Sequence, residues 1–144
     1  MSELKIQSGG MQNGIFENGQ LAFGNAPGAA SYICAYSQGA VAHGYSFGEN
    51  SYIKAVYTGA VAHGYAFGEN SYIYANAPGA VAGGYTNYAG SCIYVEGRGA
   101  VAHGFTTGVN SSIKTYGHGA IAHGCTFAKN SYIYATGHGS IAHG

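Results

Sequence analysis

The chain has 144 residues, no formal net charge and only 7% charged residues, against about 25% in an ordinary globular domain. So few Lys and Arg residues exclude the basic footprint of a nucleic-acid binder, and 47% hydrophobic residues exclude a charged disordered tail. No apolar run approaches the roughly 18 residues of a membrane helix, and we find no signal-peptide pattern at the N-terminus. We therefore expect neither a nucleic-acid partner nor membrane insertion.

Residues 1–18 do not follow the pattern of the rest of the chain. The end of a repetitive β-structure exposes unpaired strand edges, which need to be covered. We expect residues 1–18 to form an N-terminal cap, or a connection to a preceding element.

Residues 19–144 repeat with a period of 20 residues: six full repeats and the first six residues of a seventh. The block GAVAHG begins at Gly39, Gly59 and Gly99, and a second block, SYI or a close variant, follows about twelve residues later. Five slots never change: they hold the residues equivalent to Gly39, Ala42, Gly44, Ser51 and Ile53.

Each repeat predicts two short strands and two turns. Gly residues bracket short runs of Val, Ile and Tyr, which favour strands, and sequences such as GEN at 48–50 suit turns with positive φ. The predicted fold is all-β, a β-solenoid (β-roll or β-helix) with two strands in each 20-residue coil.

The two strands differ in what they can face. Ser51, Ile53 and Ala55 alternate with variable side chains, so we expect the first set inside the coil and the second set in solvent. The GAVAHG strand is restricted on both faces and carries no charge, as expected for a strand buried on both sides.

The second face of the GAVAHG strand therefore needs a cover from outside the coil. The interior is thin, and other copies of the chain are the simplest source of the missing contact, which predicts a parallel homotrimer. The residues predicted at the trimer interface are Val41, Val61, Val81, Val101, Ile121, His43, His63, His103, His123 and His143.

The repeats GAVAHGYSFGENSYI and GAIAHGCTFAKNSYI resemble the head repeats of trimeric autotransporter adhesins, and are also similar to repeats of phage and large-virus tail fibres. The resemblance covers residues 19–144. It implies left-handed coils that associate as trimers. The period of 20, the lack of a heptad stalk or membrane anchor, and three Cys residues that we interpret as free thiols favour a viral or phage fibre over a bacterial adhesin head, which stays the alternative.

The His row is the most conspicuous polar feature. Stacked coils would place consecutive imidazoles about 4.8 Å apart. We interpret the row as a packed ladder and predict no metal site, because Phe23 and Gly83 occupy the same slot and neither can bind a metal. A metal-binding ladder is the less favoured alternative, in which the ligands would be His43, His63, His103 and His123.

Tyr side chains form rows on the predicted outer face of the second strand. Exposed aromatic rows could bind a glycan or a partner protein, whereas the simpler interpretation is cross-coil stacking. The candidate ligand-binding residues are Tyr52, Tyr72, Tyr74, Tyr94, Tyr132 and Tyr134. We expect a further set of rings, including Tyr45 and Phe47, to cover a corner of the coil.

Catalytic constellations find little support. Cys125 lies near His123, but its slot is filled by Tyr or Phe in other repeats, as expected for a packed side chain. An ice-binding solenoid would need a regular Thr row, and the slot of Thr86, Thr106 and Thr126 is irregular. The sequence thus predicts a non-enzymatic segment of a virion or cell-surface fibre or spike, with no cofactor, whose partners are copies of itself and a host glycan or protein.

Overall fold

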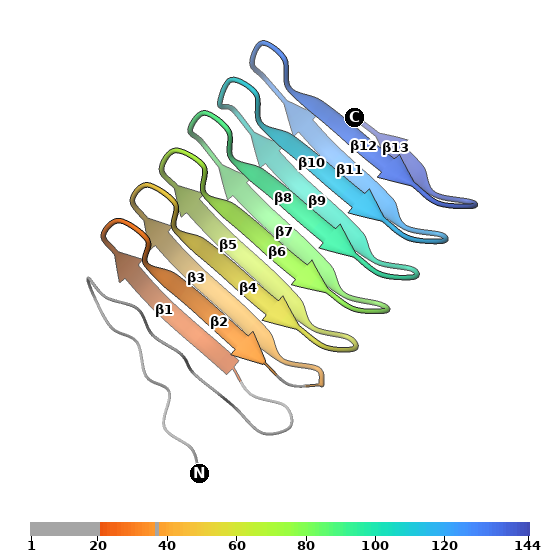
Figure 1. Cartoon of the computed structure of the whole chain (residues 1–144), viewed down its shortest axis with the longest axis horizontal. Coiled ribbons are helices and arrows are strands. Elements are labelled where there is room, and N and C mark those ends of the chain that lie inside the picture. The colour runs from red at the N-terminus through yellow and green to blue at the C-terminus, as the bar shows by residue number, and fades with distance from the viewer. Residues whose placement is uncertain (1–20, 37) are drawn as a thin grey trace.

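The computed structural model describes residues 21–36 and 38–144, and the predicted cap at 1–18 lies outside them. The described chain forms a flat two-layer β-solenoid whose coils follow one another along a single axis (Figure 1). One layer is a seven-stranded sheet of β1 (Leu21–Pro27), β3 (Val41–Phe47), β5 (Val61–Phe67), β7 (Val81–Thr86), β9 (Val101–Thr106), β11 (Ile121–Thr126) and β13 (Ile141–His143). The other is a six-stranded sheet of β2 (Tyr32–Tyr36), β4 (Tyr52–Val56), β6 (Tyr72–Asn76), β8 (Cys92–Glu96), β10 (Ser112–Tyr116) and β12 (Tyr132–Thr136).

All strand pairs are parallel, and the register equals the sequence period. Val41 pairs with Val61, and Ile53 pairs with Ile73, each 20 residues further along the chain. This confirms the predicted coil of two strands and 20 residues. The handedness of the coil and its assembly into trimers stay predictions.

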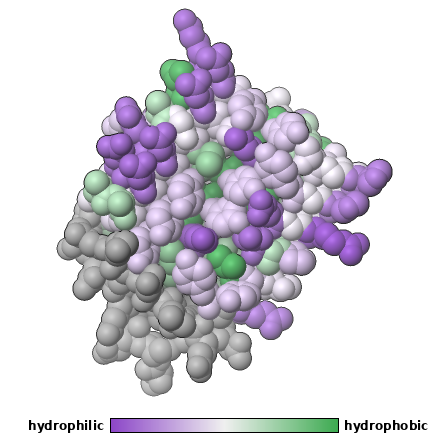
Figure 2. Space-filling view, viewed as in Figure 1, coloured by the Kyte–Doolittle hydropathy of each residue, from purple (hydrophilic) through white to green (hydrophobic). Residues whose placement is uncertain are grey.

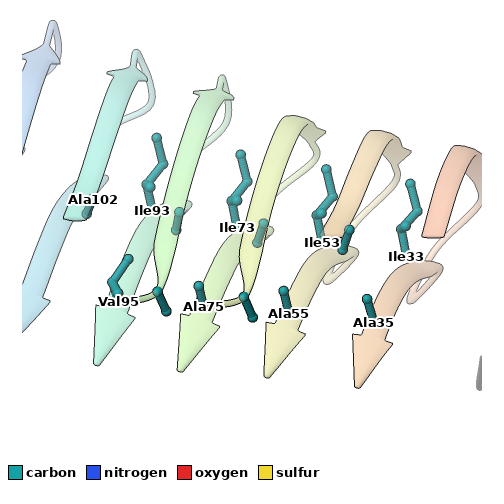
Figure 3. Packing of buried hydrophobic residues seen from close by; sticks show 14 of the residues in the cluster. Ile33, Ala35, Ile53, Ala55, Ile73, Ala75, Ile93, Val95 and Ala102 are labelled. Atoms are coloured by element: carbon teal, nitrogen blue, oxygen red, sulfur yellow. The ribbon is translucent and has the colours of Figure 1, made fainter. Parts of the chain in front are cut away.

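The core is a single layer of small side chains between the sheets. Each coil of the six-stranded sheet contributes one Ile, and Ile53, Ile73 and Ile93 are fully buried in one row (Figure 3). The seven-stranded sheet contributes Ala residues to the same core, and Ala62 and Ala82 are also fully buried. The interior is as thin as predicted, because no side chain larger than Ile is fully buried in the described coils.

The unchanging Ser slot ties neighbouring coils together. The Ser71 hydroxyl donates to the Gly48 carbonyl at 3.0 Å, and the Ser91 hydroxyl donates to the Gly68 carbonyl at 2.9 Å. Each bond links a buried hydroxyl to the turn of the preceding coil. The Ser slot can therefore be buried without leaving its hydroxyl unpaired, and the bond adds a link between coils.

The unchanging Gly in the middle of the long strands has a steric cause. Gly64 has φ of 146°, and a Cβ atom there would collide with the carbonyl oxygen of Gly44 in the neighbouring coil. Further along the solenoid, the Cδ1 of Ile93 lies against Gly104 in the same way that the Cδ1 of Ile113 lies against Gly124. Glycine thus makes room both for the adjacent backbone and for the core Ile.

Candidate functional site

The outer face of the seven-stranded sheet is a set of regular columns. In β3 the side chains of Val41, His43, Tyr45 and Phe47 point outward, while Ala42 and its inward neighbours are buried. The columns contain no Asp, Glu, Lys or Arg in any described strand of this sheet. The strands on this side of the solenoid therefore carry no charge, and several of their aromatic rings are exposed.

The predicted His ladder is present on this face. The ring centroids of His43 and His63 lie 5.2 Å apart and nearly parallel, and Phe23 stacks on His43 at 5.3 Å. His123 and His143 stack in the same way at 5.1 Å. A single chain leaves the row partly or fully exposed, so the row lies outside the coil rather than in its core.

The electrostatics at His63 favour the neutral imidazole. Burial lowers the pKa of His63 from its usual 6.5, and the neighbouring His43 and His103 lower it further. No carboxylate from the strands of this sheet faces the row to counteract the shift. A charged row would therefore repel itself, and a neutral row suits an apolar contact.

The predicted corner position of Tyr45 and Phe47 is wrong. Both belong to β3 and point outward, as do Tyr65 and Phe105 in their strands, and the rings of Tyr45 and Tyr65 stack at 4.9 Å. The strands from β1 to β11 in this sheet run two or three residues beyond the GAVAHG block or its equivalent, so the aromatic columns continue the face that carries the His row. The alternation of Val41, His43, Tyr45 and Phe47 with small residues is the sequence signal that indicates this.

The outer face of the six-stranded sheet carries the predicted Tyr rows. One column stacks Tyr32, Tyr52 and Tyr72 at 5.0 and 4.9 Å, and a second stacks Tyr74 and Tyr94 at 5.1 Å. Most of these rings are half-buried against one another, whereas Tyr132 and Tyr134 are exposed. The cross-coil stacking that the sequence predicts is therefore present.

Within residues 21–36 and 38–144, charged side chains lie only on this second face and in the turns. The Lys54 ammonium lies 5.3 Å from the centre of the Tyr74 ring, and Lys114 lies 5.0 Å from that of Tyr132. The Tyr74 hydroxyl donates to the Glu96 carboxylate at 3.2 Å, and the Tyr94 hydroxyl also donates to it. Figure 2 shows this face as weakly hydrophilic, with scattered strongly hydrophilic side chains. The two outer faces are thus chemically distinct.

The other candidate groups, which are metal ligands, Cys thiols and Thr hydroxyls, do not lie together in one site among the described residues. No group of three or more His, Cys, Asp or Glu residues within 21–36 and 38–144 is placed to hold a metal ion. The three Cys residues are free thiols, and burial raises the pKa of Cys34 to about 11. Thr86 and Thr106 are fully buried, so the Thr slot points into the core and offers no row for ice. Among the described residues there is also no helix of a length and hydropathy suited to crossing a membrane.

No family model, curated protein or solved structure matches the chain. Evidence for function therefore comes from the two outer faces.

Proposed function

We propose that this chain is a rigid, non-enzymatic segment of a homotrimeric surface fibre or spike of a virus or phage, which spaces or presents a receptor-binding surface. The observation that carries the proposal is the unequal distribution of charge. Every described charged residue lies on the six-stranded sheet or in a turn, while the outer face of the seven-stranded sheet carries Val, His, Tyr and Phe columns.

An uncharged, ring-rich face of this kind favours a protein cover. Phe47 and Tyr65 are each about two-fifths exposed, and Phe105 is 49% exposed, on one continuous side of the molecule. Large exposed apolar patches mark interaction sites. A stable interface needs about 800 Å² from each partner, roughly one-ninth of the 7090 Å² surface of the chain, which one broad face of a two-layer solenoid can provide.

A parallel trimer would cover this face and leave the Tyr rows outside. Stacked Tyr rings next to Lys54 and Glu96 combine apolar ring faces with hydrogen-bonding groups. Such a surface suits a glycan or a host protein. The proposed division of labour is therefore assembly through the seven-stranded sheet and attachment through the six-stranded sheet.

The test of assembly is the absolute mass in solution, measured by light scattering on a sizing column. We expect three times the 14.7 kDa of one chain. Val61→Lys places an ammonium on the proposed interface and should yield monomers, whereas the matched control Tyr74→Lys places the same charge on the opposite face and should remain trimeric. A wild-type monomer, or an unchanged mass for Val61→Lys, would contradict the proposal.

The test of attachment is binding of the purified trimer to an array of host glycans. We expect binding that is lost in Tyr72→Ala and Tyr74→Ala but retained in Tyr57→Ala, which removes an exposed ring from a turn. Binding that survives both substitutions would show that the Tyr rows do not form the attachment surface. A trimer that binds no glycan would be a spacer or would recognise a protein.

A further inference from the structure

Two stacked tyrosines on the six-stranded sheet share one carboxylate. Tyr74 in β6 and Tyr94 in β8 are direct partners in neighbouring parallel strands, and their rings stack at 5.1 Å with planes only 9° apart (Figure 1). The Tyr74 hydroxyl donates to Oε2 of Glu96 at 3.2 Å, and the Tyr94 hydroxyl donates to Oε1 of the same side chain. Each phenol thus has its own oxygen of a single carboxylate.

This carboxylate has no counterpart elsewhere in the sheets. Glu96 is the one acidic residue in the described strands. Tyr52 and Tyr72 form an equally close stack on the same outer face, at 4.9 Å, and are also half-buried. The phenols that donate to Glu96 are nevertheless those of Tyr74 and Tyr94. The two stacked pairs therefore differ in the carboxylate and not in the stacking.

The carboxylate matters because of how a phenol loses an electron. Burial raises the pKa of the Tyr74 and Tyr94 hydroxyls, and the negative charge of Glu96 raises it further, so both phenols stay protonated. Removing an electron from a phenol makes its O–H strongly acidic, so the loss is favoured when a base takes the proton in the same step. Such a base must lie within hydrogen-bond reach of the proton, as Glu96 does for both rings.

We propose that Tyr74 and Tyr94 form an oxidative cross-linking site, in which Glu96 accepts the phenolic protons and a carbon–carbon bond joins the two rings. The oxidant is hydrogen peroxide, acting through a haem peroxidase. Each phenol loses one electron and its hydroxyl proton, and Glu96, which is half-exposed, passes each proton on to solvent. The inference concerns a single chain and does not rest on the proposed trimer.

The bond forms between the two ring carbons that lie next to the hydroxyl-bearing carbons. After the radicals join, the hydrogen on each joined carbon moves as a proton to the phenolic oxygen, which restores both aromatic rings and both hydroxyls. The product has therefore lost two hydrogen atoms. The two electrons and two protons that leave the rings reduce one peroxide molecule to two water molecules.

The fold supplies the proximity that the coupling step needs. Radicals on separate molecules must meet by diffusion, whereas paired strands hold the Tyr74 and Tyr94 rings side by side. The Lys54 ammonium, 5.3 Å from the centre of the Tyr74 ring, makes loss of an electron from that ring less favourable. We therefore expect Tyr94 to be oxidised first and Tyr74 second.

The cross-link would join two neighbouring coils covalently. It closes a loop of one coil between β6 and β8, and such a loop restricts the unfolded chain as a disulfide does. The oxidised protein should therefore unfold at a higher urea concentration than the untreated protein.

The test treats the purified chain with hydrogen peroxide and a haem peroxidase and locates the products by peptide mass spectrometry. We expect a Tyr74–Tyr94 product, lighter by two hydrogen atoms, that elutes as a single chain under denaturing conditions. It should exceed the Tyr52–Tyr72 product in the same sample at least about tenfold, because a positioned proton acceptor accelerates a step by about a hundredfold or more. Tyr94→Phe, which removes one phenol, should abolish it.

Glu96→Gln keeps a hydrogen-bonding oxygen but cannot take a proton, so the excess over the Tyr52–Tyr72 product should be lost. The yield of Tyr52–Tyr72 in this variant reports whether the outer face is still stacked. The matched control Glu69→Gln removes a carboxylate from a turn and should keep the full excess. Equal yields from the two pairs in the wild-type chain, no Tyr74–Tyr94 product, or an undiminished excess in Glu96→Gln would each overturn the inference and leave the proposed function intact.

Discussion

Two glycine slots that never vary in the sequence should respond very differently to the same substitution. Gly59 lies in a turn with φ of 72°, and a Cβ atom there would meet nothing within 4 Å. Gly64 lies in β5 with φ of 146°, where a Cβ atom would collide with the Gly44 carbonyl oxygen. The comparison of Gly59→Ala with Gly64→Ala therefore separates backbone strain from steric exclusion.

The expected magnitudes follow from these environments. Gly59→Ala introduces only the strain of a left-handed residue, about 1–2 kcal/mol. Gly64→Ala adds a collision with a neighbouring backbone that is itself bonded within the sheet, so no side chain can move aside. We expect a loss of more than about 4 kcal/mol, a size reserved for the severest single substitutions.

The assay is urea unfolding followed by circular dichroism at several protein concentrations, so that folding is separated from association. The expected result is a folded Gly59→Ala protein with a modestly lower midpoint, and a Gly64→Ala protein that is folded only marginally or not at all. Equal losses for the two variants would refute the reasoning, because the mid-strand contact between coils would then contribute nothing beyond the φ angle.

Three further predictions concern other slots. Tyr57→Gly should raise the free energy of unfolding by about 1 kcal/mol, because Tyr57 has φ of 98° and its ring is 56% exposed, and urea midpoints would show it. Ser91→Ala should lower the free energy of unfolding by about 1 kcal/mol through loss of the bond to the Gly68 carbonyl, whereas no loss would show that this bond is dispensable. The lowered pKa of His63 means that the folded state binds its proton less readily, so stability should fall as pH drops below 6.5, and this fall should be smaller in His63→Phe when unfolding is compared at pH 8 and pH 5.

The architecture could be predicted because both the 20-residue period and the alternation of residues within each strand are visible in the sequence. A 20-residue spacing sets the coil, and alternation within Ser51, Ile53 and Ala55 sets the inward face, which the structure confirms as fully buried. Comparing repeats within one chain separates fixed slots from variable ones. That comparison gives the strand count and the core directly, since each slot occupies one position in every coil.

The extent of the long strands was less accessible. The expected block ended at Gly44, but β3 continues to Phe47 because glycine here adopts an extended, positive-φ conformation that keeps the strand in the sheet. Glycine usually indicates a break in a strand. The sequence therefore predicts a corner position for the aromatic columns, although their alternation with small residues continues the pattern of Val41 and His43.

The bend in the His row depends on how neighbouring rings pack where one side chain is missing. From the letters alone, Gly83 is a gap in a His row, and it argued only against a metal site. In the structure the gap draws the His103 ring over Gly83, while the loss of a ring at Asn87 accompanies the tilt of Tyr85 against Phe67. Each displacement is set by ring packing between coils rather than by the residue's own slot. The packing of neighbouring coils, which the residue in a single slot does not report, therefore decides where these rings lie.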